Sequence, residues 1–381
     1  MHIIIAGSGT AAIAAAQKIR EYDSGCRITV CSNESIYPYR RPLLPKLLSG
    51  RITPERFFIN PENFYSEHGI EIRLNSPVRA VKWQTGEVVL DGNEHIKYDK
   101  LLLATGAECR KISLRSDQGV IILPGLHDHK DLELLQQIIK KSRHLTLIGG
   151  GAVALDIAQE LLRMKIKVTI IERANQLLHG SIDAQCGEFV LKKLSDTEDL
   201  QIALNARSVS YETKKKEFIF EDSLQRLHSI KSDGVINCAG TVSCVIEFIP
   251  PLPDKAPSVD KYMRLIGYPE IFAAGDCVNS EFFHQGSYTD AIYSGSVAGS
   301  NIAGIKVPAV KKIREMRIAF NELKLYTAGE VLDPDSEKVI KSSGSSLQKL
   351  YYLQDKLIGC TLINDLRDSS RYYQAIAGML E

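Results

Sequence analysis

The sequence lacks the cysteine spacing of a disulfide framework, a structural zinc site or a thioredoxin-like redox pair. Its 381 residues include eight cysteines, and no two of them stand in Cys-x-x-Cys spacing. They are Cys26, Cys31, Cys109, Cys186, Cys238, Cys244, Cys277 and Cys360. We therefore expect buried free thiols in a reducing compartment, and no bound metal.

The chain also has little net charge and no long apolar run. Its formal net charge is +1, with 44% hydrophobic and 24% charged residues, which is ordinary for a soluble globular protein and predicts no nucleic-acid partner. No apolar stretch approaches the roughly 20 residues that span a bilayer. A strand is predicted from residue 2, which leaves no room for a secretory leader. We expect a cytoplasmic protein without membrane contact, either a monomer or a homodimer.

One pattern occurs twice: a strand, a glycine turn, a helix and a second strand. In the first copy the strands are residues 3–6 and 27–31 and the helix is 11–20. In the second copy the strands are 145–148 and 167–172 and the helix is 152–163. Parallel strands joined by a right-handed helical crossover have this order, so the sequence predicts an α/β fold with two Rossmann-like domains.

The rest of the chain reads as strands and one more helix. We predict a hairpin-like region at residues 78–98 and a strand-rich stretch at 208–220. Three buried strands are predicted at residues 101–106, 234–238 and 271–276, and a helix is predicted at 290–303. Residues 349–353 and 357–362 alternate around Gln354-Asp355, which predicts an antiparallel hairpin in a small C-terminal α+β domain. The polar stretch 334–346 is predicted to be a loop.

The first glycine turn, Gly7-Ser8-Gly9-Thr10-Ala11-Ala12, has the spacing of a dinucleotide site. Gly7 permits the tight turn, Gly9 lets the backbone approach a pyrophosphate, and Ala12 allows close packing of helix on strand. Thr10 and Ala11 open the helix, whose N-terminus favours the anionic oxygens.

A carboxylate usually ends the second strand of such a unit and receives the ribose hydroxyls. Here the strand ends at Cys31, and Ser32-Asn33-Glu34 follows. Glu34 is the only acid in reach and is therefore the candidate, although it lies a residue or two late, and Asn33 is expected as a further FAD contact. The alternative is that Glu34 is a solvated loop residue.

The second turn, Gly149-Gly150-Gly151-Ala152-Val153-Ala154, again joins a strand to a helix. We expect Gly149, Gly151, Ala152 and Val153 to contact a dinucleotide. Glu172 ends the next strand about 20 residues later, where a carboxylate favours NADH over NADPH. The neighbouring Arg173 weakens that preference.

Further segments, in this order, resemble the two-dinucleotide flavoprotein reductases of the pyridine-nucleotide-disulfide oxidoreductase superfamily. They are Tyr98 to Gly106, Asp233 to Gly240, Ile271 to Asp276 and Tyr288 to Gly304. The resemblance is greatest to the NADH:rubredoxin reductases and the flavin module of assimilatory nitrite reductases. It implies domains of the three-layer ββα type: FAD-binding at 1–106 and 230–305, NADH-binding at 107–229, and a C-terminal interface domain at 306–381.

The resemblance also implies site residues. Asp276 would hold the ribitol chain of FAD, the alternative being a helix cap. The other implied FAD contacts are Arg41, Pro42, Val78, Ala104, Thr105, Gly106 and Gly275, and Gly240 would contact NADH.

The segment Tyr37 to Lys46 has no cysteine, whereas relatives that reduce disulfides or peroxides carry one near position 42 or as a pair on the first long helix. It resembles the Tyr-x-Arg-Pro-x-Leu-x-Lys signature of the rubredoxin-reductase branch. That resemblance implies that Lys46 reaches the flavin and pairs with an acid at the position of Asp156, where glutamate is usual. The alternative for Lys46 is an ordinary surface lysine.

The implied activity is hydride transfer from NADH to FAD, then electron transfer to a carrier such as rubredoxin without a thiol relay. Arg40, Arg41 and Lys46 are expected to form a basic rim that attracts an acidic carrier. Two alternatives remain open: an NADH oxidase or peroxidase, and an FAD-binding redox sensor or assembly protein with slow turnover.

Overall fold

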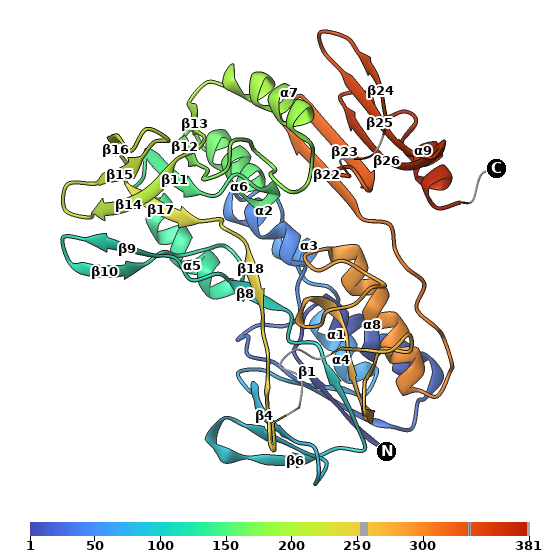
Figure 1. The fold of residues 1–381 in the computed structure, drawn as a ribbon. Coiled ribbons are helices and arrows are strands. Elements are labelled where there is room, and N and C mark those ends of the chain that lie inside the picture. Colours follow the sequence, from blue (N-terminus) through green and yellow to red (C-terminus); the bar gives the residue numbers. More distant parts are fainter. Residues whose placement is uncertain (252–257, 334, 336, 379–381) are drawn as a thin grey trace. The chain divides into compact units, whose positions relative to one another are not determined.

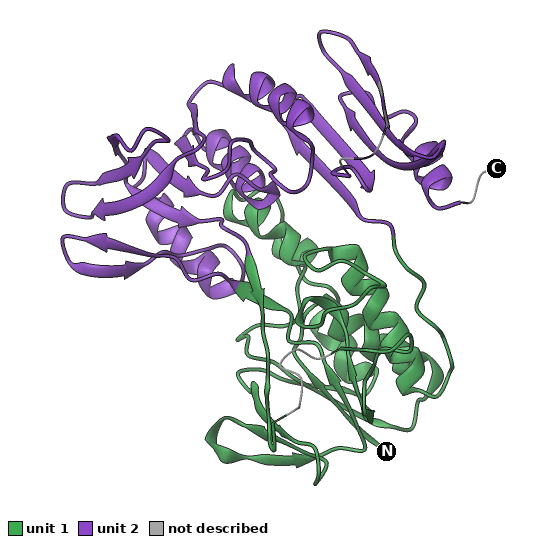
Figure 2. Ribbon diagram, viewed as in Figure 1, with its two compact units in different colours: residues 1–108, 241–312 green, residues 109–240, 313–381 purple. Residues whose placement is uncertain are grey.

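The computed structural model describes residues 1–251, 258–333, 335 and 337–378, which form two compact units. Unit 1 comprises residues 1–108 and 241–312, and unit 2 comprises residues 109–240 and 313–381 (Figure 2). The sequence placed residues 230–240 with the first domain. Strand β17 (Gly234–Asn237) instead pairs with β11 (His144–Ile148) in unit 2, because both are buried parallel strands of one sheet.

Unit 1 is built on a six-stranded sheet of order β20-β21-β7-β1-β2-β3. The strands are β1 (His2–Ala6), β2 (Arg27–Cys31), β3 (Ile70–Arg73), β7 (Lys100–Leu103), β20 (Arg264–Leu265) and β21 (Tyr268–Ala273). All pairs are parallel except β20 with β21. Parallel strands end at one edge of the sheet, so the first glycine turn and the end of β21 come to the same edge.

A second sheet and several helices complete unit 1. The sheet has the order β19-β4-β5-β6, with β4 (Val78–Lys82), β5 (Glu87–Leu90), β6 (His95–Lys97) and β19 (Glu247–Phe248). The helices are α1 (Thr10–Tyr22), α2 (Leu44–Leu48), α3 (Pro54–Phe57), α4 (Glu62–Glu67) and α8 (Tyr288–Ile302). Short 3-10 turns are η1 (Arg41–Leu43), η2 (Asp91–Asn93) and η3 (Gly275–Cys277), and β8 (Ala107–Cys109) and β18 (Thr241–Ser243) are short strands. In Figure 1, α1 and α8 lie on one side of β1, and β4 and β6 lie on the other.

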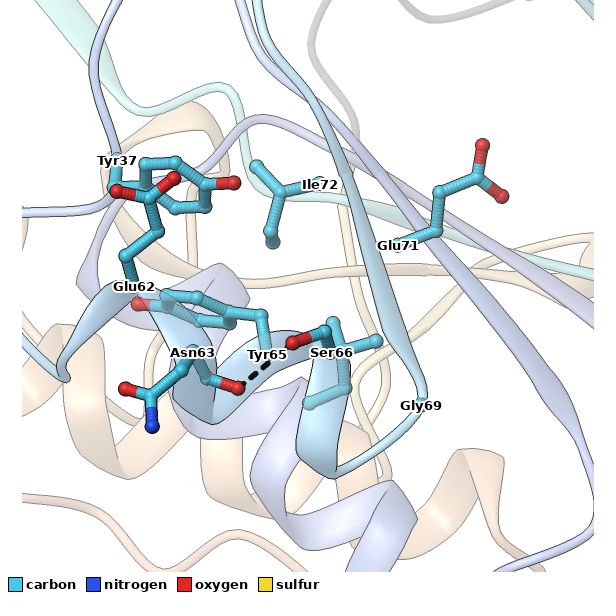
Figure 3. A pocket seen from close by; sticks show the side chains of 9 residues that line it. Tyr37, Glu62, Asn63, Tyr65, Ser66, Gly69, Glu71 and Ile72 are labelled. Atoms are coloured by element: carbon cyan, nitrogen blue, oxygen red, sulfur yellow. Dashed lines mark hydrogen bonds between the residues drawn. The ribbon is translucent and has the colours of Figure 1, made fainter.

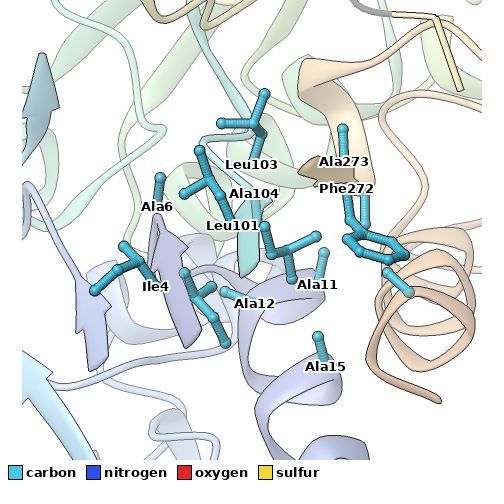
Figure 4. Packing of buried hydrophobic residues seen from close by; sticks show 14 of the residues in the cluster. Ile4, Ala6, Ala11, Ala12, Ala15, Leu101, Leu103, Ala104, Phe272 and Ala273 are labelled. Carbon is cyan, nitrogen blue, oxygen red and sulfur yellow. The ribbon is translucent and has the colours of Figure 1, made fainter. Parts of the chain in front are cut away.

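Helices α1 and α8 pack backbone to backbone. A β carbon on Gly295 would lie 2.2 Å from the carbonyl oxygen of Ala11, and one on Gly299 would lie 2.5 Å from that of Ala15. The alanine-rich face of α1 allows this approach and also packs on the sheet, where Ala12 is fully buried in the same hydrophobic cluster as Leu101 and Leu103 (Figure 4).

Unit 2 contains the second parallel sheet, of order β13-β12-β11-β17. Its other strands are β12 (Lys167–Ile171) and β13 (Leu200–Ala203), and its helices are α5 (His129–Ile139), α6 (Ala152–Arg163) and α7 (Ala184–Ser195). A further sheet has the order β10-β9-β14-β15-β16, with β9 (Ser113–Ser116), β10 (Gly119–Ile122), β14 (Arg207–Glu212), β15 (Glu217–Glu221) and β16 (Leu227–Lys231). The predicted duplication is thereby confirmed, and helix α6 has the predicted bounds.

The C-terminal part of unit 2 is a five-stranded antiparallel sheet with one helix, α9 (Ser369–Ile376). Its strands are β22 (Glu315–Phe320), β23 (Leu323–Gly329), β24 (Glu337–Ser342), β25 (Leu347–Leu353) and β26 (Lys356–Ile363). The predicted hairpin is confirmed, with Gln354 and Asp355 at positive φ in the turn. The predicted loop at 334–346 is wrong for residues 337–342, because polar β24 pairs with β25 as an edge strand. Pro334 lies outside the described residues.

Within the described part of the chain, no helix combines the length and the apolar character that a bilayer span requires.

Candidate dinucleotide-binding sites

The first glycine turn is held tightly against the end of β7. Gly7 has a φ of +108°, and a β carbon there would lie 2.2 Å from the carbonyl oxygen of Ala104. Its N–H donates to the carbonyl of Cys31 at 2.8 Å. Only glycine fits this position, since an L side chain would be strained in φ and would collide with the backbone.

Gly9 has the opposite surroundings. It is the N-cap of α1, with an extended φ of −70° and ψ of −177°, and a β carbon there would meet no atom within 4 Å. The open space lies beside the free N–H groups at the start of α1, at Thr10 and Ala11. A pyrophosphate needs both features: room for close approach and helix N–H donors.

The second turn repeats this geometry in unit 2. Gly149 has a φ of +106°, and its β carbon would lie 2.6 Å from the carbonyl oxygen of Cys238. Gly151 is the N-cap of α6, with φ −80°, ψ −176° and no atom within 4 Å of a β carbon. Ala152 and the exposed Val153 open the helix. Each of the two turns therefore leaves open space beside the N-terminus of a helix, and we call this space the cradle of that turn.

Glu172 lies directly beside the second turn. One carboxylate oxygen accepts from the N–H of Gly150 at 2.5 Å, and the other accepts from the N–H of Ala174 at 2.6 Å. The side chain is half-buried, and the neighbouring Arg173 is exposed. A carboxylate at the end of the second strand is therefore fixed at the edge of the cradle.

Glu34 is not a solvated loop residue, so that alternative is wrong. It is only 4% exposed, and its carboxylate accepts from the hydroxyl of Tyr39 at 2.9 Å and from the guanidinium of Arg41 at 2.8 Å. The sequence did not reveal Tyr39 as a partner, because the contact depends on how the loop folds back. The adjacent Asn33 is exposed.

A hydroxyl bridge that the sequence also did not reveal joins the first turn to the end of β2. The Oγ atoms of Ser8 and Ser32 lie 2.6 Å apart, and both residues are buried. The bridge fixes the middle of the turn and the start of the segment that carries Glu34.

Gly275 and Asp276 follow β21 in the 3-10 turn η3. The N–H of Gly275 donates to the hydroxyl of Ser294 at 3.1 Å, and a carboxylate oxygen of Asp276 accepts from the N–H of Gly286 at 2.9 Å. Gln285 donates to the carbonyl of Asp276 at 3.2 Å. The N-cap of α8 is Ser287, so Asp276 does not cap that helix.

The remaining predicted residues lie on both units. In unit 1, Ala104 and Val78 are buried, Val78 lies in β4, and the Thr105 hydroxyl donates to the carbonyl of Cys244 at 2.7 Å. The carbonyl of Gly106 accepts from the N–H of Cys244 at 3.0 Å. In unit 2, Gly240 is exposed, with a φ of +88°.

The basic residues before α2 are not a simple exposed rim. Arg40 donates to the carbonyls of Arg56, Phe58 and Ile59, with distances of 3.1 and 3.0 Å for the first and last. Since Arg41 pairs with Glu34, both arginines have structural roles within unit 1.

Lys46 is exposed on α2, and Pro42 lies in η1 before that helix. Asp156 is exposed on α6, in the other unit. The pairing of Lys46 with Asp156 stays a prediction.

A cavity of about 850 Å³ lies elsewhere in unit 1, between α4, β3 and Tyr37 (Figure 3). The rings of Tyr37 and Tyr65 stack at 5.7 Å, and Glu62 lies beside Tyr37. None of the residues that line it is a predicted site residue.

The cysteines of unit 1 near these elements are protonated thiols at neutral pH. Burial raises the pKa of Cys31 to about 12 and that of Cys244 to about 11, and it also raises the pKa of Cys277. Among the described residues, no cluster of histidine, cysteine and acidic side chains is placed to hold a metal ion.

Two Rossmann-like units with matching open glycine turns define the class of oxidoreductases that bind two dinucleotides. The sequence profile of one family in that class, described as "Pyridine nucleotide-disulphide oxidoreductase", matches residues 1–298. The chain belongs to this family, and it is a flavoprotein reductase that uses FAD and NAD(P)H.

Relatives and solved structures agree with this assignment. The chain is 27% identical over 380 residues to a rubredoxin-NAD(+) reductase of Pseudomonas putida, covering 96% of each chain. It is 28% identical over 408 residues to an NADH oxidase of Methanocaldococcus jannaschii, covering 97% of this chain and 89% of the relative. The structure of NADH:rubredoxin oxidoreductase from Clostridium acetobutylicum matches its fold with a TM-score of 0.82 at 21% identity, covering 99% of this chain and 95% of that one.

Proposed function

We propose that the protein transfers a hydride from NADH to FAD and passes the electrons to a small one-electron carrier of the rubredoxin kind. The observation that carries the proposal is the matched pair of open glycine turns, one in each unit. The names of the relatives support the choice of carrier.

FAD is assigned to unit 1 and NADH to unit 2. The FAD contacts are the first turn (Gly7, Gly9, Thr10, Ala11, Ala12) and Asn33, Glu34, Arg41, Pro42, Lys46, Val78, Ala104, Thr105, Gly106, Gly275 and Asp276. The NADH contacts are Gly149, Gly151, Ala152, Val153, Glu172 and Gly240. We propose that residues 1–106 and 241–305 bind FAD, that residues 107–240 bind NADH because β17 lies in the second parallel sheet, and that residues 306–381 form an interface domain.

The flavin supplies the redox chemistry, and the chain supplies orientation and electrostatics. The N-terminal N–H groups of α1 and α6 hold the two pyrophosphates. The Lys46 ammonium would stabilise negative charge on the reduced flavin, and Asp156 is the acid that we propose would orient this lysine. The Asp276 carboxylate accepts hydrogen bonds from sugar hydroxyls, as a short acceptor at a strand end does.

Glu172 supports a preference for NADH. Its two hydrogen bonds from Gly150 and Ala174 fix the carboxylate beside the cradle, where it accepts from ribose hydroxyls and repels a 2′-phosphate. Arg173 is exposed, and its charge reduces this discrimination without reversing it.

A reductase without a thiol relay should tolerate thiol alkylation. Since burial holds the pKa of Cys31 and Cys244 near 12 and 11, little thiolate exists at pH 8. Iodoacetamide treatment at that pH should therefore leave NADH turnover with ferricyanide within about twofold of the untreated rate. Complete loss, with one alkylated cysteine identified by mass spectrometry, would show that a thiol carries electrons.

Turnover with protein and small-molecule acceptors separates the reductase from its alternatives. We expect steady NADH turnover with an acidic rubredoxin, slowed about tenfold or more between low and 0.3 M salt, because charge steers the encounter. Ferricyanide serves as the control whose reduction needs no protein docking. Rapid NADH-dependent production of water or peroxide from oxygen would favour an oxidase, and a single slow turnover with every acceptor would favour a sensor.

A further inference from the structure

Lys349 is a buried lysine in the C-terminal sheet, and it reaches the start of α7. It lies on β25 and is only 4% exposed. Its ammonium is 2.5 Å from a carboxylate oxygen of Asp183 and donates to the side-chain oxygen of Gln185 at 2.8 Å. A lysine is buried in this way only when it is paired, so this contact specifically connects β25 with the start of α7 within unit 2. We call this connection the joint.

Tyr351, two residues further along β25, strengthens the joint. It is fully buried, and its hydroxyl donates to the same Asp183 oxygen at 3.0 Å. The other oxygen of Asp183 accepts from the N–H of Cys186 at 3.0 Å and so caps α7. Burial alone would raise the pKa of Asp183, but the hydrogen bonds from Lys349, Cys186 and Tyr351 outweigh it and hold that pKa below its ordinary value.

Asp183 also ends the loop that begins at Glu172. Leu178 in that loop donates its N–H to the carbonyl of Gly150 at 2.9 Å. The side chain of Leu177 is fully buried, and a β carbon on Gly150 would lie 2.7 Å from its Cδ2 atom. The loop therefore packs directly against the second glycine turn.

The Gln176 side chain closes the far end of the loop, donating to the carbonyl of Ile182 at 2.9 Å. The loop is thus fixed at one end by Glu172 at the glycine turn and at the other by Asp183. Of these two anchors, the second depends on the C-terminal sheet.

We propose that the C-terminal sheet sets the affinity of the second glycine turn for the pyridine nucleotide, with Lys349 and Tyr351 as positioning residues that hold the 172–183 loop through Asp183. The inference rests on the proposed assignment of NADH to that turn. It gives residues 313–381 a role in nucleotide binding, although Lys349 and Tyr351 touch neither the turn nor Glu172 in any hydrogen bond described above.

The test compares Tyr351→Phe and Lys349→Met with Lys356→Met, an exposed lysine at the end of the same hairpin, in the FAD-loaded protein. Tyr351→Phe and Lys349→Met should both raise the KM for NADH about 5- to 20-fold. Their kcat for ferricyanide reduction should stay within about twofold of the wild-type value, and both should retain FAD. Hydrogen exchange at Ala174 and Leu178 should accelerate at least about tenfold. Lys356→Met should change neither measurement.

A lower Tm with an unchanged KM and unchanged exchange at Ala174 and Leu178 would overturn the inference, since the joint would then serve stability alone. Lys349→Met removes the ammonium that pairs with Asp183. If that variant does not fold, Tyr351→Phe decides because it keeps the ion pair. Absence of NADH oxidation by the wild-type protein would instead defeat the proposed function. An active wild type whose network variants keep their KM defeats this inference only.

Discussion

Gly9→Ala is expected to remove FAD from the protein while leaving the fold of unit 1 in place. A β carbon at Gly9 meets no protein atom, and its φ of −70° and ψ of −177° are open to alanine. The fold should therefore change in stability by no more than about 1 kcal/mol, the cost of alanine at an N-cap. The methyl group instead occupies the space that the pyrophosphate of FAD needs. Overpacking of this kind costs about 3 kcal/mol, which corresponds to a roughly 100-fold loss of affinity for FAD.

The measurement is the flavin absorbance per chain of the purified Gly9→Ala variant. The Tm of this variant without FAD is compared with the Tm of the wild-type protein without FAD. Gly7→Ala is the contrasting variant, because its β carbon would collide with Ala104 at 2.2 Å and its φ is +108°. That change should destabilise the fold itself by about 3 kcal/mol or more. Full retention of FAD by Gly9→Ala would show that the first turn does not hold the cofactor.

Gly151→Ala is expected to produce the second large effect, on NADH and not on FAD. Its β carbon also meets no atom within 4 Å, so unit 2 should fold normally. The KM for NADH should rise about 100-fold for the same steric reason, with bound FAD unchanged. Steady-state kinetics with ferricyanide give the KM, and absorbance gives the FAD content.

Gly149→Ala is the matched contrast in unit 2, since its β carbon would lie 2.6 Å from the carbonyl oxygen of Cys238 and would disturb the fold. If Gly151→Ala lost FAD instead of NADH affinity, the assignment of the two turns would have to be exchanged. An unchanged KM would remove the second turn from the NADH site.

The parts of the fold that depend on local pattern were predictable from the sequence. Strand β2 and helix α6 have the predicted bounds, because β-branched runs and an alanine- and leucine-rich stretch specify them residue by residue. The two glycine turns were predictable for the same reason, since their spacing is local and each stands between a strand and a helix.

Features that depend on distant partners were not predictable. Strand β24 is polar, and only its pairing with β25 makes it a strand. The burial of Glu34 depends on Tyr39 and Arg41, which fold back over it. The joint between Asp183 and Tyr351 connects positions 168 residues apart, and no local pattern announces it.

Anaerobic titration of the purified protein with NADH tests the central claim most directly. The account predicts that the protein carries one FAD per chain and that about one NADH per FAD bleaches the oxidised flavin spectrum within a second, because both dinucleotides are held for hydride transfer. A protein that purifies without flavin and does not take up added FAD, or whose flavin stays oxidised in excess NADH, would contradict the account.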